Sequence, residues 1–143
     1  MVAHSTNQAW LETVHEEALE PDMPIVDPHH HLWDTREGAT QPRYLLDEYL
    51  DDISGGHNIV ASVFIECGTV YRASGPEAFR PVGETEFVNG IAAMSASGQY
   101  GPCRVAAGIV GCVDLKIGDE SADVLDRHIE AGGGRFRASK GVP

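Results

Sequence analysis

The alternation of strand-type and helix-type segments between residues 24 and 137 constrains the fold more than any other feature. Four short segments are rich in apolar and β-branched residues, as buried parallel strands are: 24–27, 59–66, 104–113 and 135–137. Between them lie three stretches with apolar residues at helical spacing, marked by Leu46 and Tyr49, by Val88 and Ile91, and by Val124 and His128. This order predicts an α/β fold with a parallel sheet and right-handed crossovers.

Two parallel architectures fit this order, namely an open doubly wound sheet and consecutive units of a (β/α)8 barrel. A dinucleotide-binding domain of the doubly wound class carries Gly-x-Gly-x-x-Gly directly after its first strand. Here the first strand ends in Asp27-Pro28-His29-His30-His31 instead. The sequence therefore indicates no phosphate-binding loop at this place, and the histidine cluster becomes the candidate site.

The length of 143 residues suits one ordinary domain. We expect residues 24–143 to form this domain and residues 1–23 to form a helical extension. Within the extension, Trp10, Val14 and Ala18 share one face at helical spacing.

The chain is strongly acidic, with 22 Asp and Glu against 10 Lys and Arg and a net charge of −12. This balance argues against a nucleic-acid or anionic-membrane surface, because both bind basic patches. No apolar run reaches the roughly 18 residues of a membrane span, and the first residues do not have the pattern of a signal peptide. We therefore expect a cytoplasmic protein with a small-molecule substrate and with neither a nucleic-acid nor a membrane partner. The three cysteines include no Cys-x-x-Cys pair and are expected to be reduced, buried side chains.

The histidine cluster has a spacing that suits metal binding. If the first strand continues through it, Asp27, His29 and His31 point to one face of the sheet, and Pro28 and His30 point to the other. Two imidazoles at i and i+2 then converge on one divalent ion, and imidazole is a common zinc ligand. The alternative is that these are surface histidines of a loop without a ligand role.

The segment Ile25-Val26-Asp27-Pro28-His29-His30-His31-Leu32-Trp33-Asp34 resembles the first-strand motif of the amidohydrolase-related family, the metal-dependent hydrolases with a TIM-barrel fold. That family has Asp-x-His-x-His at this place, commonly followed by Leu-Trp-Asp. The resemblance extends collinearly along the chain, through residues 60–66, 84–88, 105–111 and 134–137.

The resemblance implies a hydrolase of amide, lactone or related C–O and C–N bonds, or a decarboxylase as in some relatives. It implies that His29 and His31 are the first pair of ligands of a divalent metal, with zinc as the first candidate, which polarises a carbonyl or activates a water. Lactonase-like members depend less on a metal, so the identity of the ion stays open.

The family's barrel takes about 250 residues, and four strands fit into this chain. The resemblance therefore implies the first half of a (β/α)8 barrel, with the later ligating histidines and the catalytic aspartate beyond Pro143. We expect a truncated fragment whose catalytic residues are unknown. Such a fragment needs the missing second half of the barrel or associates with itself, because its sheet edges are unpaired. The alternative function is a non-catalytic half-barrel remnant that acts as an interaction module.

Three further residues are candidates for binding or support. Glu66 ends the second strand and is expected at the same rim as the histidines, where it orients a ligand or makes a structural hydrogen bond. Arg135 and Arg137 share strand parity, and Arg137 is our candidate for contact with an anionic substrate. The long loop over residues 67–83 is predicted to be a binding loop or simply solvated. His128 is predicted to lie at the surface of its helix or at the edge of the core.

Overall fold

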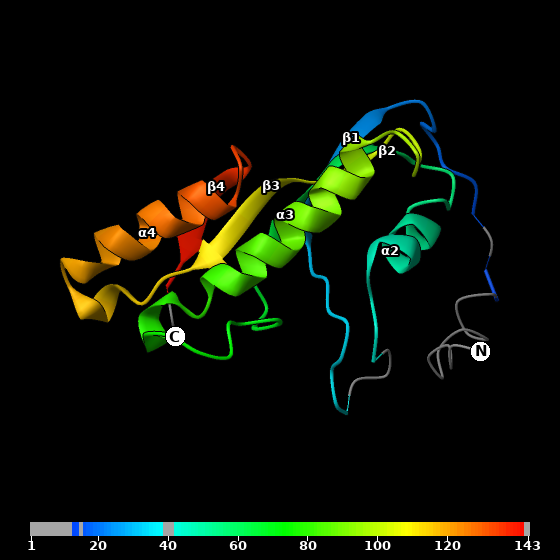
Figure 1. The fold of residues 1–143 in the computed structure, drawn as a ribbon. Helices are drawn as coiled ribbons and strands as arrows, with labels where there is room; N and C mark the ends of the chain where they lie inside the picture. Colours follow the sequence, from blue (N-terminus) through cyan, green and yellow to red (C-terminus); the bar gives the residue numbers. More distant parts are fainter. Residues whose placement is uncertain (1–12, 15, 39–41, 142–143) are drawn as a thin grey trace.

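The computed structural model describes residues 13–14, 16–38 and 42–141, and it shows the alternation that the sequence predicts (Figure 1). The strands are β1 Pro24–His30, β2 Asn58–Ile65, β3 Arg104–Cys112 and β4 Phe136–Lys140. The helices are α2 Leu46–Asp52, α3 Val82–Ala96 and α4 Glu120–Ala131, with short 3-10 turns at Glu77–Phe79 and Leu115–Ile117. The predicted α/β class is confirmed.

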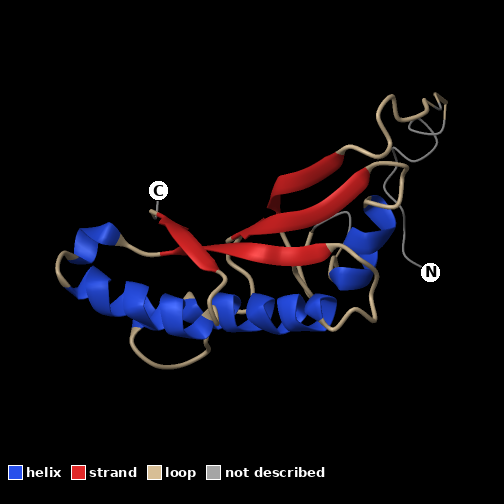
Figure 2. Ribbon diagram, turned by 90° about the horizontal axis from the view of Figure 1, so that it is seen from above, coloured by secondary structure: helices blue, strands red, loops and turns tan. Residues whose placement is uncertain are grey.

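The four strands form one parallel sheet, as predicted, and their order in it is β1-β2-β3-β4. Consecutive strands are connected through a helix, and the helices gather on one side of the sheet in Figure 2. Within the part of the chain that the structure describes, no helix covers the other side. None of the described helices has the length and apolar character needed to cross a membrane.

The core lies between the sheet and its helices. Phe64 of β2, Ile109 of β3 and Val88 of α3 are among its fully buried side chains. The face of β2 that points away from the helices is more open. Val63 and Ile65, on the face away from the helices, are only partly buried because no described helix packs over them.

The helical extension predicted for residues 1–23 is wrong where the structure describes it. Residues 16–18 are irregular and residues 19–23 form bends and a turn, and residues 1–12 and 15 lie outside the described part of the chain. Glu16 and Glu20 would place like charges one turn apart on a helix, and Pro21 follows them directly. Both features oppose a helix at this place.

Candidate functional site

The carboxyl end of β1 contains a bulge that rearranges the histidine cluster. Asp27 pairs with Ser62 and His30 pairs with Phe64, so β1 has one more residue than β2 over this stretch. Pro28 lies within the bulge, and it has no amide hydrogen to give to the ladder.

The bulge reverses the expected alternation of side chains. Asp27 accepts a hydrogen bond from the hydroxyl of Tyr49 on α2 at 2.9 Å, and the His30 ring lies 4.5 Å from the Tyr49 ring. Asp27 and His30 therefore both face the helices. The prediction that Asp27 shares a face with His29 and His31 is wrong, because the extra residue shifts the parity of the strand.

The expected convergence of His29 and His31 is present in the structure. Their Nε2 atoms are 3.1 Å apart, and the two rings meet edge to face. Nδ1 of His31 lies 2.7 Å from the carbonyl oxygen of Ile65. Because a carbonyl oxygen only accepts, Nδ1 carries the proton, and Nε2 of the neutral ring keeps its lone pair. The backbone thus orients His31 as a nitrogen ligand.

The two histidines fit half of a metal site. Zinc binds imidazole nitrogens at about 2.0–2.1 Å in tetrahedral geometry, so two nitrogens on one ion lie about 3.3 Å apart. The Nε2 separation of 3.1 Å is close to this distance. A protein zinc site takes at least three ligands, and among the described residues no group of three His, Cys, Asp or Glu side chains is placed to hold a metal.

His30, the middle histidine, belongs to the core. It is buried, and its Nε2 lies 3.0 Å from the hydroxyl oxygen of Ser62, which also accepts from the amide of Ala106. Burial lowers the pKa of His30 to about 4, so the ring is neutral at physiological pH. Its Nδ1 is buried and has no hydrogen-bond partner among the described residues.

Glu66 lies directly after β2, at the sheet rim where the histidines lie, as predicted. It is buried, and it accepts hydrogen bonds from the Tyr71 hydroxyl and, at 2.8 Å, from Nζ of Lys140. Burial raises the pKa of Glu66, but the bonds from Lys140 and Tyr71 outweigh it and hold the pKa below its ordinary value. The three side chains line a cavity of about 710 Å³, together with Arg80 of the loop between β2 and α3.

Lys140 was missed in the sequence, and Arg137 was expected in its place. The Arg137 guanidinium donates to the carbonyls of Gly134, at 2.8 Å, and Phe136, so it turns toward the amino end of β4 and away from Glu66. Arg135 faces the helices and donates to Asn89 at 2.7 Å. The shared parity of the two arginines is lost because β4 has a register shift against β3 at Arg137, between Phe136 and Ala138.

Glu84 is a second residue that sequence reasoning missed. It lies in the first turn of α3 with an exposed fraction of 1%. Its Oε1 accepts hydrogen bonds from the backbone amides of Cys67 and Thr69, at 3.0 and 3.2 Å, whereas the buried Oε2 has no partner among the described residues. Burial raises the pKa of Glu84 to about 7. Its spacing of four residues before the core residue Val88 was the available signal.

His128 is fully buried, so its predicted place at the helix surface or core edge is wrong. Its Nε2 donates to the carbonyl of Cys112 at 3.1 Å, and its Nδ1 accepts from the hydroxyl of Thr85 at 2.8 Å. The ring stacks on Phe136. Its two nitrogens are thus used to join α4 to β3 and α3, which is a structural role.

Comparison with known proteins gives one distant relative. The chain is 28% identical over 127 residues to the uncharacterized protein y4mH of Sinorhizobium fredii (strain NBRC 101917 / NGR234). The match covers 76% of this chain and 37% of the relative, so the chain spans little more than a third of the length of that protein. No protein-family model matches the chain, and no solved structure matches it.

Proposed function

We propose that the chain is part of a metal-dependent hydrolase that acts on amide, lactone or related C–O and C–N bonds of a small molecule. The observation that carries this proposal is the pair His29 and His31 at the carboxyl end of β1. Their Nε2 atoms are spaced for one ion, and the Ile65 carbonyl holds His31 in the tautomer that ligates through Nε2.

The order of the strands supports the barrel part of the proposal. A (β/α)8 barrel adds parallel strands in sequence order and keeps its helices on one face of the sheet. The strand order β1-β2-β3-β4 and the one-sided helices have this form. In the proposed protein, the remaining strands and the further metal ligands come from outside the described residues.

The chain's own side chains have distinct tasks in this proposal. When bound, a divalent ion supplies a Lewis acid that polarises a carbonyl or activates water. His29 and His31 hold it, and the Ile65 carbonyl orients His31. Glu66 stays ionised at neutral pH because of Lys140 and Tyr71, so it accepts a hydrogen bond from a substrate hydroxyl.

Calorimetric titration with Zn²⁺ tests the proposal. Two ligands make a partial site, so we expect weak binding by the chain and no binding by the double variant His29→Ala, His31→Ala. His57→Ala is the matched control, because His57 is an exposed histidine just before β2, at the opposite end of the sheet. Equal zinc affinity of the double variant and the parent would contradict the assignment.

A further inference from the structure

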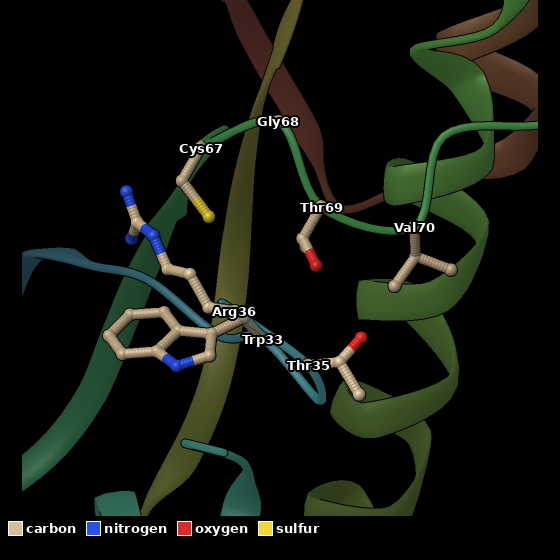
Figure 3. A pocket seen from close by; sticks show the side chains of 7 residues that line it. All are labelled: Trp33, Thr35, Arg36, Cys67, Gly68, Thr69 and Val70. Atoms are coloured by element: carbon tan, nitrogen blue, oxygen red, sulfur yellow. The ribbon is translucent and has the colours of Figure 1, made fainter. Parts of the chain in front are cut away.

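A second, smaller cavity of about 230 Å³ lies between the loops that follow β1 and β2 (Figure 3). Trp33, Thr35 and Arg36 come from the first loop, and Cys67 and Thr69 come from the second. In Figure 3 the two threonine side chains lie on the same side of the cavity and the Cys67 sulfur points into it. The cavity is therefore lined by a cation, two hydroxyl groups and an aromatic ring.

Arg36 is held in place by an aromatic ring and by the backbone. Its guanidinium lies 5.1 Å from the centre of the Trp33 ring, and its amide donates to the carbonyl of Pro42 at 2.9 Å. Trp33 in turn stacks on Tyr44 and exchanges two backbone hydrogen bonds with it. A guanidinium that rests over an aromatic ring keeps the N–H groups at its edge available to a ligand.

Arg36 has no carboxylate partner among residues 13–14, 16–38 and 42–141. Other cations of this chain do pair with carboxylates, namely Arg43, Arg72, Arg127 and Lys140. Because acidic residues outnumber basic ones by 22 to 10, an arginine that lines a cavity without such a partner is unexpected. Its N–H donors are available to an anion.

The loop after β2, which forms the other wall of the cavity, is held in place by Glu84 of α3. Glu84 accepts hydrogen bonds from the amides of Cys67 and Thr69, and the Thr69 hydroxyl has no hydrogen bond to any described residue. The neighbouring Val70 has φ of 48°, a left-handed conformation that a β-branched residue rarely adopts. Such backbone strain is characteristic of ligand-binding loops.

We propose that this cavity binds the carboxylate group of a small molecule, with Arg36 as its cationic partner. The Thr35 and Thr69 side chains lie on the other side of the cavity in Figure 3, so they face the rest of the molecule and not its carboxylate. This site goes beyond the proposed hydrolase function, because it needs neither a metal nor His29 and His31. One guanidinium balances one negative charge, and the net charge of −12 disfavours more highly charged anions. A monocarboxylate therefore fits better than inorganic phosphate.

The fluorescence of Trp33 reports on this site. In a Trp10→Phe variant, Trp33 is the one remaining tryptophan, since the sequence has two. We expect sodium propionate, titrated at constant ionic strength with EDTA present, to change the Trp33 emission with a saturable curve. Propionamide, which has the same shape without the charge, should cause no such change. Inorganic phosphate should bind more weakly than propionate.

Variants assign the binding to the residues of the cavity. Arg36→Gln should weaken propionate binding about tenfold or more, because it removes a charged hydrogen-bond donor. Arg104→Gln is the matched control, since Arg104 is an exposed arginine at the start of β3 and should leave the affinity unchanged.

Three results would each overturn the proposal: equal binding of propionate and propionamide, unchanged propionate affinity in Arg36→Gln, or tighter binding of phosphate than of propionate. The measurement contains EDTA, so its failure is distinguishable from a failure of zinc binding at His29 and His31.

Discussion

Glu84 combines complete burial with a carboxyl oxygen that has no partner among the described residues. Burial raises its pKa from 4.5 to about 7. Between pH 4.5 and about pH 7, Glu84 keeps its proton in the folded chain and loses it in the unfolded chain. The free energy of unfolding therefore falls as the pH rises through this range. A shift of this size corresponds to a loss of about 3 kcal/mol on going from pH 4 to pH 8.

We therefore expect Glu84→Gln to reduce the loss of stability between pH 5 and pH 8, since an amide has no proton to lose in this range. Thermal unfolding at the two pH values measures this difference. Glu86→Gln is the matched control, because Glu86 is exposed and its hydrogen bond with Arg72 lowers its pKa. That control should leave the loss of stability unchanged. An identical pH dependence in the parent and in Glu84→Gln would show that the Glu84 carboxyl does not titrate in this window.

At the scale of residues, the sequence predicted the positions that depend on local spacing. The convergence of His29 and His31 and the place of Glu66 at the rim follow from their positions at strand ends. Asp27 was misplaced because a bulge at one residue reverses strand parity, and spacing alone does not reveal a bulge. Lys140 was missed because its partner lies 74 residues earlier in the chain, a contact that only the strand order creates.

At the scale of elements, the apolar pattern predicted the strands and helices of residues 24–140, but it was less accurate at their ends. The periodic residues of α3 begin at Phe87, whereas the helix begins at Val82. Its first turn contains Gly83, Glu84 and Thr85, which are buried against the loop after β2 and against α4. Because polar residues and a glycine occupy these core positions, the apolar pattern did not reveal the first turn, and the spacing of Glu84 from Val88 was the one signal for it.

Gly83 allows the loop after β2 to pack against α3. A Cβ atom at this position would lie 2.8 Å from the carbonyl oxygen of Val70 and 2.8 Å from the amide nitrogen of Arg72. Gly83→Ala should therefore destabilise the protein by about 1–3 kcal/mol, although alanine is the better helix former. Gly90 is the matched control on the same helix, since a Cβ there has no atom within 4 Å. We expect Gly90→Ala to stabilise the protein by about 0.5–1 kcal/mol. Denaturant unfolding measures both changes, and a stabilised Gly83→Ala variant would show that the close approach is not real.

At the scale of the whole molecule, the sheet formed by the described residues has helices on one face and no strand paired to its two edges, at β1 and at β4. Val26 of the edge strand β1 points away from the helices, because its neighbour Asp27 bonds Tyr49 of α2, and Val26 is 54% exposed. Val63 and Ile65 of β2 lie on the same face. In a closed barrel these side chains would pack in layers in the interior.

We predict from this open face that the chain forms dimers or soluble aggregates and binds dyes that detect exposed apolar surface. Each apolar side chain left in water costs about 1.5–3 kcal/mol relative to burial, which is large against a domain stability of about 5–15 kcal/mol. The charge of −12 opposes association, but salt screens it beyond about 10 Å, so apolar contact should dominate.

Val26→Glu should weaken association in light scattering. Leu115→Glu, the matched control, adds the same charge at an exposed residue of a 3-10 turn and should weaken it less. A monomer of 15.4 kDa that unfolds cooperatively would argue against the half-barrel and for a self-contained open sheet.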